Sequence, residues 1–235
     1  MPPEIIAHRG VPRERPENTL AAFDLALDQG ADGIELDVHA TRDGVVVVHH
    51  DAELRGDGEP ARISELTLTE LRGRAASRAP DEGVPTLAEV LALVGERARV
   101  YVEVKAAGIE EHVVAAIRAA GGDCAVHAFD HRIARRVRTL APEIPVGILL
   151  ASYLLDIRGA IHLAGATAVW QQWDLVDAAL VRDAAAAGAR VVAWTVNEPA
   201  DARRLARLGV SALCTDVPAA TRFALATLAP GEPDR

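Results

Sequence analysis

The chain has 235 residues, of which half are apolar and only 3% aromatic, and its formal net charge is −9. This length suffices for a substantial core and is common for an α/β barrel that forms one domain, whereas the negative charge argues against a basic surface for nucleic acid. No apolar stretch is long enough to span a bilayer and no basic leader precedes the first strand-like run, so we expect a cytoplasmic protein without an integral membrane segment.

Short apolar runs alternate with helical patterns along most of the chain. The expected parallel strands lie near residues 4–8, 33–38, 99–104, 124–128, 145–149, 166–170, 190–195 and 211–215. The expected helices run from Asn18 or Thr19 to Gly30, from Thr86 toward Val94, from Ile109 to Ala120, from His131 to Leu140, from Asp177 to Ala187, from Pro199 to Leu208 and from Pro218 to Leu228. Eight successive strand–helix units favour a TIM (β/α)8 barrel, in which sites lie at the carboxyl ends of the strands.

The segment after the second strand interrupts this alternation. Only residues 39–44 separate Val38 from the apolar run at 45–50, which is too short for a parallel crossover. We therefore predict an antiparallel hairpin that turns at residues 42–44. Folding back around this turn places residue 50 level with residue 37. Because strand neighbours point to opposite sides, we expect His50, and not His49, near Asp37.

A longer excursion follows the hairpin. Residues 52–85 are rich in Gly, Asp, Arg and Pro, with one helical piece around Leu66 to Arg72. Long loops of this kind tend to be functional, and we expect this one to pass over the barrel mouth. The interpretation is a single barrel domain over residues 1–235 with a short insertion at about 52–85 and a frayed tail from Pro230 to Arg235.

Two carboxylates mark the end of the second strand. Glu35 and Asp37 stand at i and i+2, so both point to one face of the strand. Two anions on one face repel unless positive charge lies between them, and oxygen ligands suit a hard divalent cation such as Mg²⁺ or Ca²⁺. Two carboxylates at i and i+2, taken alone, more often belong to a solvent-exposed face of a strand. Here the run that ends in two histidines, and a further strand with Glu103 and Lys105 on one face, favour a site whose histidines move protons.

Several motifs together resemble one known family. They are Ala7-His8-Arg9-Gly10, Pro16-Glu17-Asn18-Thr19, Ile34-Glu35-Leu36-Asp37-Val38, Thr41-x-Asp43-Gly44, His50-Asp51, Val102-Glu103-Val104-Lys105, Ala193-Trp194-Thr195-Val196-Asn197 and Thr215-Asp216-x-Pro218. Their order and content are similar to those of the glycerophosphodiester phosphodiesterases, relatives of the phosphatidylinositol-specific phospholipases C on a TIM barrel. Each motif is weak alone, but the set covers nearly the whole chain and is specific.

The resemblance implies roles for particular residues. It implies that Glu35, Asp37 and Glu103 hold one divalent cation, that His8 and His50 act as acid and base, and that Arg9 and Lys105 grip the phosphate of a glycerophosphodiester. In some descriptions of the family the second histidine lies on or near the metal, so both roles are open for His50. For Trp194, which ends an apolar run, the resemblance favours a wall of the glycerol pocket over a place in the core.

The implied function is metal-dependent hydrolysis of glycerophosphodiesters to glycerol 3-phosphate and an alcohol. One alternative is a lysophospholipid or phosphoinositide-like phosphodiesterase, which a long apolar lid would favour and the polar excursion does not. Another is a catalytically silent phosphate-ester binding protein, which should have lost some of the five proposed metal ligands and histidines that this chain retains. Departures such as Ala128, where the family often has Ser, and Arg55-Gly56-Asp57-Gly58 after His-Asp bear on the alcohol accepted rather than on the reaction.

For the remaining polar and aromatic residues we favour structural explanations. Glu17 and Asn18 are interpreted as a helix start with Asn18 as N-cap, while Asp51 could equally orient His50 or close the hairpin. For the tryptophans at 170 and 173 a place on the barrel rim is slightly favoured. The histidines at 39, 49, 112, 127, 131 and 162 lack carboxylate partners at useful spacing and are expected on the surface or satisfied in the core. Both cysteines, at 124 and 214, are expected to be buried free thiols.

Overall fold

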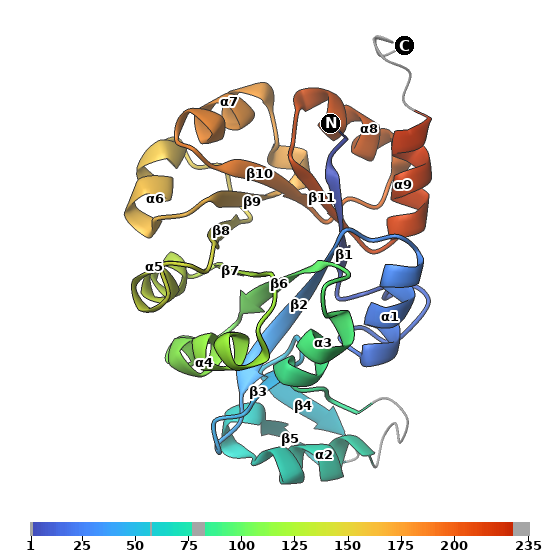
Figure 1. Ribbon diagram of the computed structural model, residues 1–235, viewed down its shortest axis with the longest axis vertical. Helices are drawn as coiled ribbons and strands as arrows, with labels where there is room; N and C mark the ends of the chain where they lie inside the picture. The colour runs from blue at the N-terminus through green and yellow to red at the C-terminus, as the bar shows by residue number, and fades with distance from the viewer. Residues whose placement is uncertain (1, 57, 77–82, 228–235) are drawn as a thin grey trace.

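A closed ring of parallel strands forms the centre of the protein. The computed structural model describes residues 2–56, 58–76 and 83–227. In this part of the chain the ring has eight strands: β1 (Glu4–His8), β2 (Gly33–Ala40), β6 (Arg99–Val104), β7 (Cys124–Ala128), β8 (Val146–Leu150), β9 (Ala168–Gln172), β10 (Arg190–Trp194) and β11 (Ala212–Thr215). Because β1 pairs with both β2 and β11, the ring closes (Figure 1). The predicted TIM barrel is confirmed.

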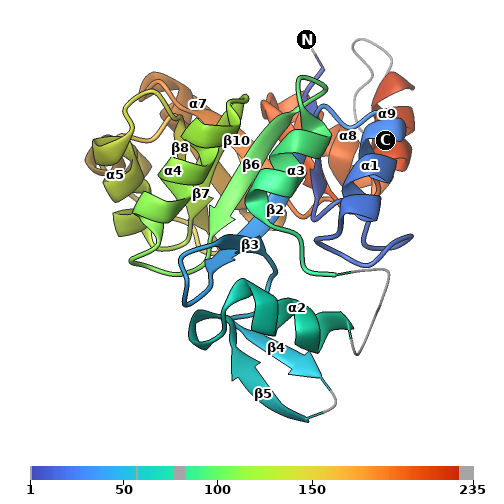
Figure 2. The same ribbon diagram turned by 60° about the horizontal axis from the view of Figure 1, so that its bottom comes forward.

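Helices alternate with these strands and cover the outside of the ring (Figures 1 and 2). They are α1 (Leu20–Asp28), α3 (Leu87–Val94), α4 (Glu110–Ala120), α5 (His131–Leu140), α6 (Ile157–Ala164), α7 (Ala178–Ala186), α8 (Pro199–Leu208) and α9 (Pro218–Ala226). No helix was predicted at α6, because its interior Gly159 weakens the helical signal. The residue that could have indicated this helix is Asp156, which caps it by accepting a hydrogen bond from the Gly159 backbone N–H. Leu228, the expected end of the last helix, and the tail from Pro230 to Arg235 lie outside the described residues.

Strand alternation divides the core into two layers. Ile34, Leu36 and Val38 of β2 face outward and are buried with Phe23 of α1 between ring and helices. A smaller cluster that includes Tyr101 and Trp170 fills the ring itself. Because successive strand residues point to opposite sides, the carboxylates of β2 belong to the inner layer. The sequence of β2 therefore places charge inside the ring at the mouth formed by the carboxyl ends of the strands.

The predicted hairpin is present, with a register one residue from the expected one. The strand β3 (Val46–Val48) pairs antiparallel with β2 outside the ring, with Val48 opposite Val38. The turn closes on Thr41, whose backbone N–H donates to the Val45 carbonyl, so it consists of residues 42–44 as predicted, and a turn of these three residues sets the observed register. The His49 backbone N–H then donates to the Asp37 carbonyl at 3.0 Å. Residue 49, and not residue 50, is therefore level with residue 37.

The insertion after β3 forms a small unit with its own core. It contains the antiparallel strands β4 (Glu53–Gly56) and β5 (Gly58–Arg62), a 3₁₀ turn at Ile63–Glu65 and α2 (Leu68–Ala76). Buried apolar residues, including Val47, Leu54, Ile63, Leu71 and Val84, pack together beneath it. Figure 2 shows the unit projecting from the barrel beside β3. The helical piece was predicted, whereas the two strands were not, because their short sequences carry little apolar alternation.

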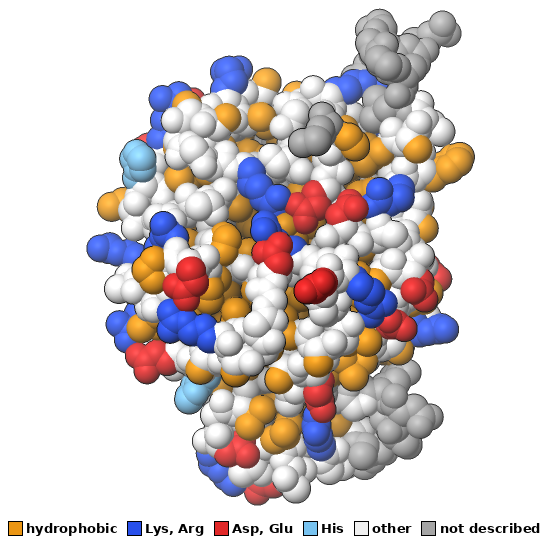
Figure 3. Space-filling model, in the orientation of Figure 1, with side chains coloured by type: hydrophobic (Ala, Val, Ile, Leu, Met, Phe, Trp, Pro, Cys, Tyr) orange, Lys and Arg blue, Asp and Glu red, His pale blue; other side chains and the backbone are white. Residues whose placement is uncertain are grey.

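Three further expectations concern burial and surface. Cys124 and Cys214 are free and buried, as predicted. Within the described residues, no helix has the length and apolar character needed to cross a membrane. On the face drawn in Figure 3, basic side chains are interspersed with acidic ones.

Candidate active site

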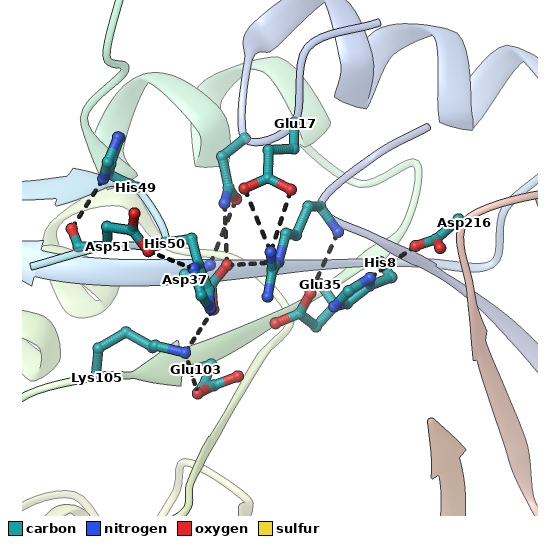
Figure 4. A network of polar contacts seen from close by, with 12 residues as sticks. His8, Glu17, Glu35, Asp37, His49, His50, Asp51, Glu103, Lys105 and Asp216 are labelled. Carbon is teal, nitrogen blue, oxygen red and sulfur yellow. Dashed lines mark hydrogen bonds and ion pairs between the residues drawn. The ribbon is translucent and has the colours of Figure 1, made fainter. Parts of the chain in front are cut away.

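Seven predicted site residues meet at the mouth of the barrel. They come from the carboxyl ends of the neighbouring strands β1, β2 and β6 and from the segment after β3: His8, Arg9, Glu35, Asp37, His50, Glu103 and Lys105. Figure 4 labels all of these residues except Arg9. The parallel register sets His8 beside Glu35 and Asp37 beside Glu103. Residues distant in sequence are therefore neighbours because the strands that carry them are adjacent in the ring.

Asp37 is fully buried and contacts two cations. Arg9 Nε lies 2.9 Å from its Oδ2 and Lys105 Nζ lies 3.3 Å from its Oδ1, and both are ion-pair contacts outside hydrogen-bond geometry. The Asn18 side-chain amide donates to Oδ2 at 3.0 Å. Although burial opposes ionisation, Arg9, then Lys105 and then Asn18 lower the pKa of Asp37. The carboxylate is consequently charged and holds both cations at the mouth.

Arg9 is fixed in an uncommon backbone conformation. Its φ is +55°, in the left-handed region, which costs a non-glycine residue about 1–3 kcal/mol. The guanidinium that contacts Asp37 also donates from Nη1 to Glu17 Oε2 at 3.1 Å, and the Arg9 backbone N–H donates to Glu35 Oε2 at 3.2 Å. Gly10 follows with φ +88°, and a Cβ there would lie 2.7 Å from the Ala22 backbone. The turn after β1 therefore fixes the guanidinium above the carboxylates.

Glu35 and Glu103 carry the remaining negative charge. Burial, and then repulsion from Asp37, raises the pKa of both carboxyl groups, that of Glu35 well above its usual range. Lys105 Nζ lies 2.8 Å from Glu103 Oε1 and partly offsets this effect. With all three carboxylates ionised, the two cations leave one net negative charge in a buried cluster. A divalent cation fits such an arrangement, because its charge would favour the ionised form of each carboxylate.

His127 also reaches this cluster, although the sequence analysis placed it among the histidines without a carboxylate partner. That expectation is wrong, because β7 pairs with β6 and sets His127 beside Glu103. Its Nε2 lies 3.8 Å from Glu35 Oε1, and donor atoms of Glu35, Glu103 and His127 all lie within 4.8 Å of one another. Burial lowers the pKa of His127 to about 3, so the ring is neutral at physiological pH. The register between strands was the signal that could have identified it.

The histidine at the end of β1 is oriented by a carboxylate from the last strand. His8 Nδ1 lies 2.7 Å from Asp216 Oδ1. The other oxygen of Asp216 accepts a hydrogen bond from Asn197 Nδ2 at 2.7 Å, and the Asp216 backbone N–H donates to Asn197 Oδ1. Burial opposes ionisation of Asp216, but the contacts with His8 and Asn197 lower its pKa. This leaves Nε2 of His8 as the nitrogen able to exchange a proton with a ligand.

A second histidine is oriented in a similar way. His50 Nδ1 lies 2.9 Å from Asp51 Oδ1, and His50 is close enough to Asp37 to contribute to lowering its pKa. His49 instead contacts the Asp51 carbonyl through its Nδ1. Although the observed register differs from the predicted one by one residue, His50 approaches the carboxylates because β3 ends at Val48 and the chain bends after it. The contact of Asp51 with the ring is the geometry expected of an orienting group.

Several neighbouring residues lie in other places than the sequence suggested. Thr19, and not Asn18, caps α1 by accepting from the Ala22 N–H, while Asn18 has φ +59° and contacts Asp37 directly. Trp170 is buried inside the ring rather than on the rim. Trp194 is separated from β1 by one strand, β11, and its ring packs edge-on against Phe129 at 5.6 Å between centroids. These two aromatic side chains form an apolar wall at the mouth.

Comparison with known proteins gives a consistent result. A sequence profile of the glycerophosphoryl diester phosphodiesterase family matches residues 8–220. A glycerophosphodiester phosphodiesterase of Caldanaerobacter subterraneus subsp. tengcongensis is 32% identical over 228 residues, which cover 91% of this chain and 94% of that protein.

Solved structures share the whole fold. An Oleispira antarctica phosphodiesterase in complex with the product sn-glycerol-3-phosphate has a TM-score of 0.87 and 26% identity, over 96% of this chain and 98% of that one. A glycerophosphodiester phosphodiesterase from Agrobacterium tumefaciens str. C58 has a TM-score of 0.79 and 28% identity, over 94% and 98% of the two chains. The similarity therefore extends over almost the full length of the chain.

The raised pKa of Glu35 predicts a stability effect in excess chelator. At pH 7 the unfolded chain ionises this group freely while the folded state resists, so Glu35→Gln should raise the free energy of unfolding by more than about 1 kcal/mol. The difference should shrink toward pH 4, where the carboxyl group is protonated in both states. Urea unfolding provides the measurement, with the exposed Glu65→Gln as the control that should change little. A wild-type protein as stable as Glu35→Gln at pH 7 would contradict the electrostatic account.

Proposed function

The chain belongs to the glycerophosphoryl diester phosphodiesterase family, a family of phosphoric diester hydrolases, and we propose that it hydrolyses glycerophosphodiesters to glycerol 3-phosphate and an alcohol. The observation that carries this proposal is the convergence of a carboxylate cluster, two cations and two carboxylate-bound histidines at one barrel mouth. The structural relative with bound sn-glycerol-3-phosphate supports the same substrate class.

The proposed cofactor is one divalent cation, Mg²⁺ or Ca²⁺, held by Glu35, Asp37 and Glu103. All three donors are oxygen, as hard cations prefer. Asp37 Oδ1 is buried without a hydrogen-bond partner among the described residues, and the raised pKa values of the two glutamates reflect charge that a cation would neutralise. When bound, such a cation polarises a phosphoryl oxygen and lowers the pKa of an adjacent hydroxyl group.

Arg9 and Lys105 are proposed to bind the phosphate. Both side chains are largely buried and held by Asp37, so little reorganisation is needed when negative charge grows on the phosphoryl oxygens. Fixed donors of this kind stabilise a transition state more than a flexible surface cation does. The planar guanidinium adds a defined orientation, which Glu17 maintains from its other side.

His8 and His50 are proposed to exchange protons with the substrate. In the first step the neighbouring glycerol hydroxyl bonds to phosphorus while the bond to the alcohol oxygen breaks. One histidine takes the hydroxyl proton and the other gives a proton to the departing alcohol. Water then opens the cyclic phosphodiester with the two roles exchanged. Asp216 and Asp51 would stabilise whichever ring is protonated, because each carboxylate contacts Nδ1.

The surroundings of His50 favour a small polar alcohol over a lipid chain. A groove of about 660 Å³ near it is lined by the charged residues Asp51, Glu53 and Arg62, by His39 and Ser64, and by alanines and Ile109. An acyl chain would leave these charged groups desolvated, so no observation favours the lysophospholipid alternative. Trp194 and Phe129 are proposed to contact the glycerol carbons. We also propose a cytoplasmic location, which the two free cysteines support.

Removal of the cation tests the proposed chemistry. Excess chelator should abolish hydrolysis of glycerophosphocholine, and Mg²⁺ or Ca²⁺ should restore it, because the metal serves the reaction. The circular dichroism spectrum should be unchanged throughout, since the barrel core does not involve these residues. Full turnover in excess chelator after dialysis would remove the metal from the mechanism.

The two adjacent histidines supply a matched pair. His50→Ala should lower kcat/KM by about 10² to 10⁴, the usual contribution of proton transfer, whereas His49→Ala should have little effect because its ring contacts the Asp51 carbonyl at the hairpin end. Turnover of both variants would be compared at equal metal occupancy and equal melting temperature. A larger loss at His49 would show that the wrong ring has been assigned to the site.

The leaving group distinguishes the general acid from the base. If His8 protonates the departing alcohol, His8→Ala should be strongly impaired with glycerophosphocholine and much less with a p-nitrophenyl phosphodiester, whose leaving group needs no proton. The comparison applies where the chemical step limits both rates. An equal loss on both substrates would assign the acid role to His50 and leave His8 as the base.

A further inference from the structure

His127 occupies a fixed position inside the ring. It is 2% exposed, and its ring stacks on Trp170 with 4.0 Å between centroids and an interplanar angle of 4°. Gly147 on the next strand makes room for this pair, since a Cβ there would lie 2.9 Å from Trp170 and 3.3 Å from His127. The stacking and the small neighbour restrict the ring plane, so its nitrogens are held in a set direction.

The distances from His127 suit shared coordination better than hydrogen bonding. Its Nε2 lies 3.8 Å from Glu35 Oε1, beyond hydrogen-bond range. Two donors at about 2.0–2.2 Å from one cation can stand up to about 4.3 Å apart.

Unlike His127, Asp37 has close polar contacts within the protein. One of its oxygens contacts Arg9 and Asn18, and the other lies near Lys105. In the described residues, the group of potential ligands that converges consists of Glu35, Glu103 and His127. This set combines two hard carboxylate oxygens with one softer imidazole nitrogen. Imidazole nitrogen favours Zn²⁺ and Co²⁺, whereas Ca²⁺ is bound by oxygen ligands.

We infer that His127 is a nitrogen ligand of the cation held by Glu35 and Glu103, and that it shifts the preference of the site from Ca²⁺ toward Co²⁺ and Zn²⁺. The inference rests on the metal site of the proposed function. It differs from the all-oxygen set of Glu35, Asp37 and Glu103 by one donor atom, and that difference can be measured as cation selectivity.

Calorimetric titration of the chelator-stripped protein with Co²⁺ and with Ca²⁺ tests the inference. His127→Phe keeps a ring against Trp170 but lacks the nitrogen, and His162→Phe, on the exposed side of α6, is the matched control. His127→Phe should weaken Co²⁺ binding by at least about tenfold while Ca²⁺ binding changes by less than about threefold. The absorption spectrum of bound Co²⁺ should change in the same variant and not in the control.

Each other outcome overturns a defined statement. Unchanged Co²⁺ affinity in His127→Phe, or an equal loss for both cations, would make His127 a packing residue only. A second test needs no variant and measures the X-ray absorption spectrum of wild-type protein loaded with Zn²⁺. A spectrum that lacks imidazole scattering would also overturn the inference. No cation binding to wild type, or binding that Glu103→Gln leaves unchanged, would instead overturn the proposed metal site itself.

Discussion

The side chain of Asp37 is fully buried, and the arrangement of the rest of the site depends on how its negative charge is balanced. A buried carboxylate is stable only when it is paired and hydrogen-bonded. Arg9, Lys105 and Asn18 meet this requirement from three different segments of the chain. The same contacts keep both cations at the mouth, so the stability of one anion and the position of the proposed phosphate-binding groups have a common cause.

This arrangement is costly for the fold. Arg9 and Asn18 both adopt the left-handed backbone region, and Glu35 and Glu103 are buried close to Asp37, which opposes their ionisation. Strained backbone and destabilised charge commonly coincide at functional sites, where the surrounding structure compensates for them. Here the compensation comes from the outer core between ring and helices, which is apolar and separate from the mouth.

Apolar runs and helix signals in the sequence predicted most of the architecture. Each barrel strand is a short apolar run that follows the end of one helix and precedes the start of the next, so it can be recognised locally. The hairpin followed from the shortness of residues 39–44. The failures were non-local: His127 and Asp216 reach the site through pairing with β6 and β1, which the sequence of either strand does not reveal. Asn18 was assigned as an N-cap because asparagine can equally cap a helix or hydrogen-bond to a buried carboxylate. The register differed by one residue because the turn at 42–44 sets Thr41 opposite Val45, and therefore residue 49 opposite residue 37.

The central claim is that one buried cluster holds both a cation and the phosphate of the substrate. Crystals grown with Mn²⁺ and glycerol 3-phosphate, measured where manganese scatters anomalously, test it most directly. The account predicts one anomalous peak in contact with Glu35 and Glu103, with phosphate oxygens on Arg9 and Lys105. A peak elsewhere, or phosphate bound at the opposite end of the barrel beside Arg99 and Arg190, would contradict it.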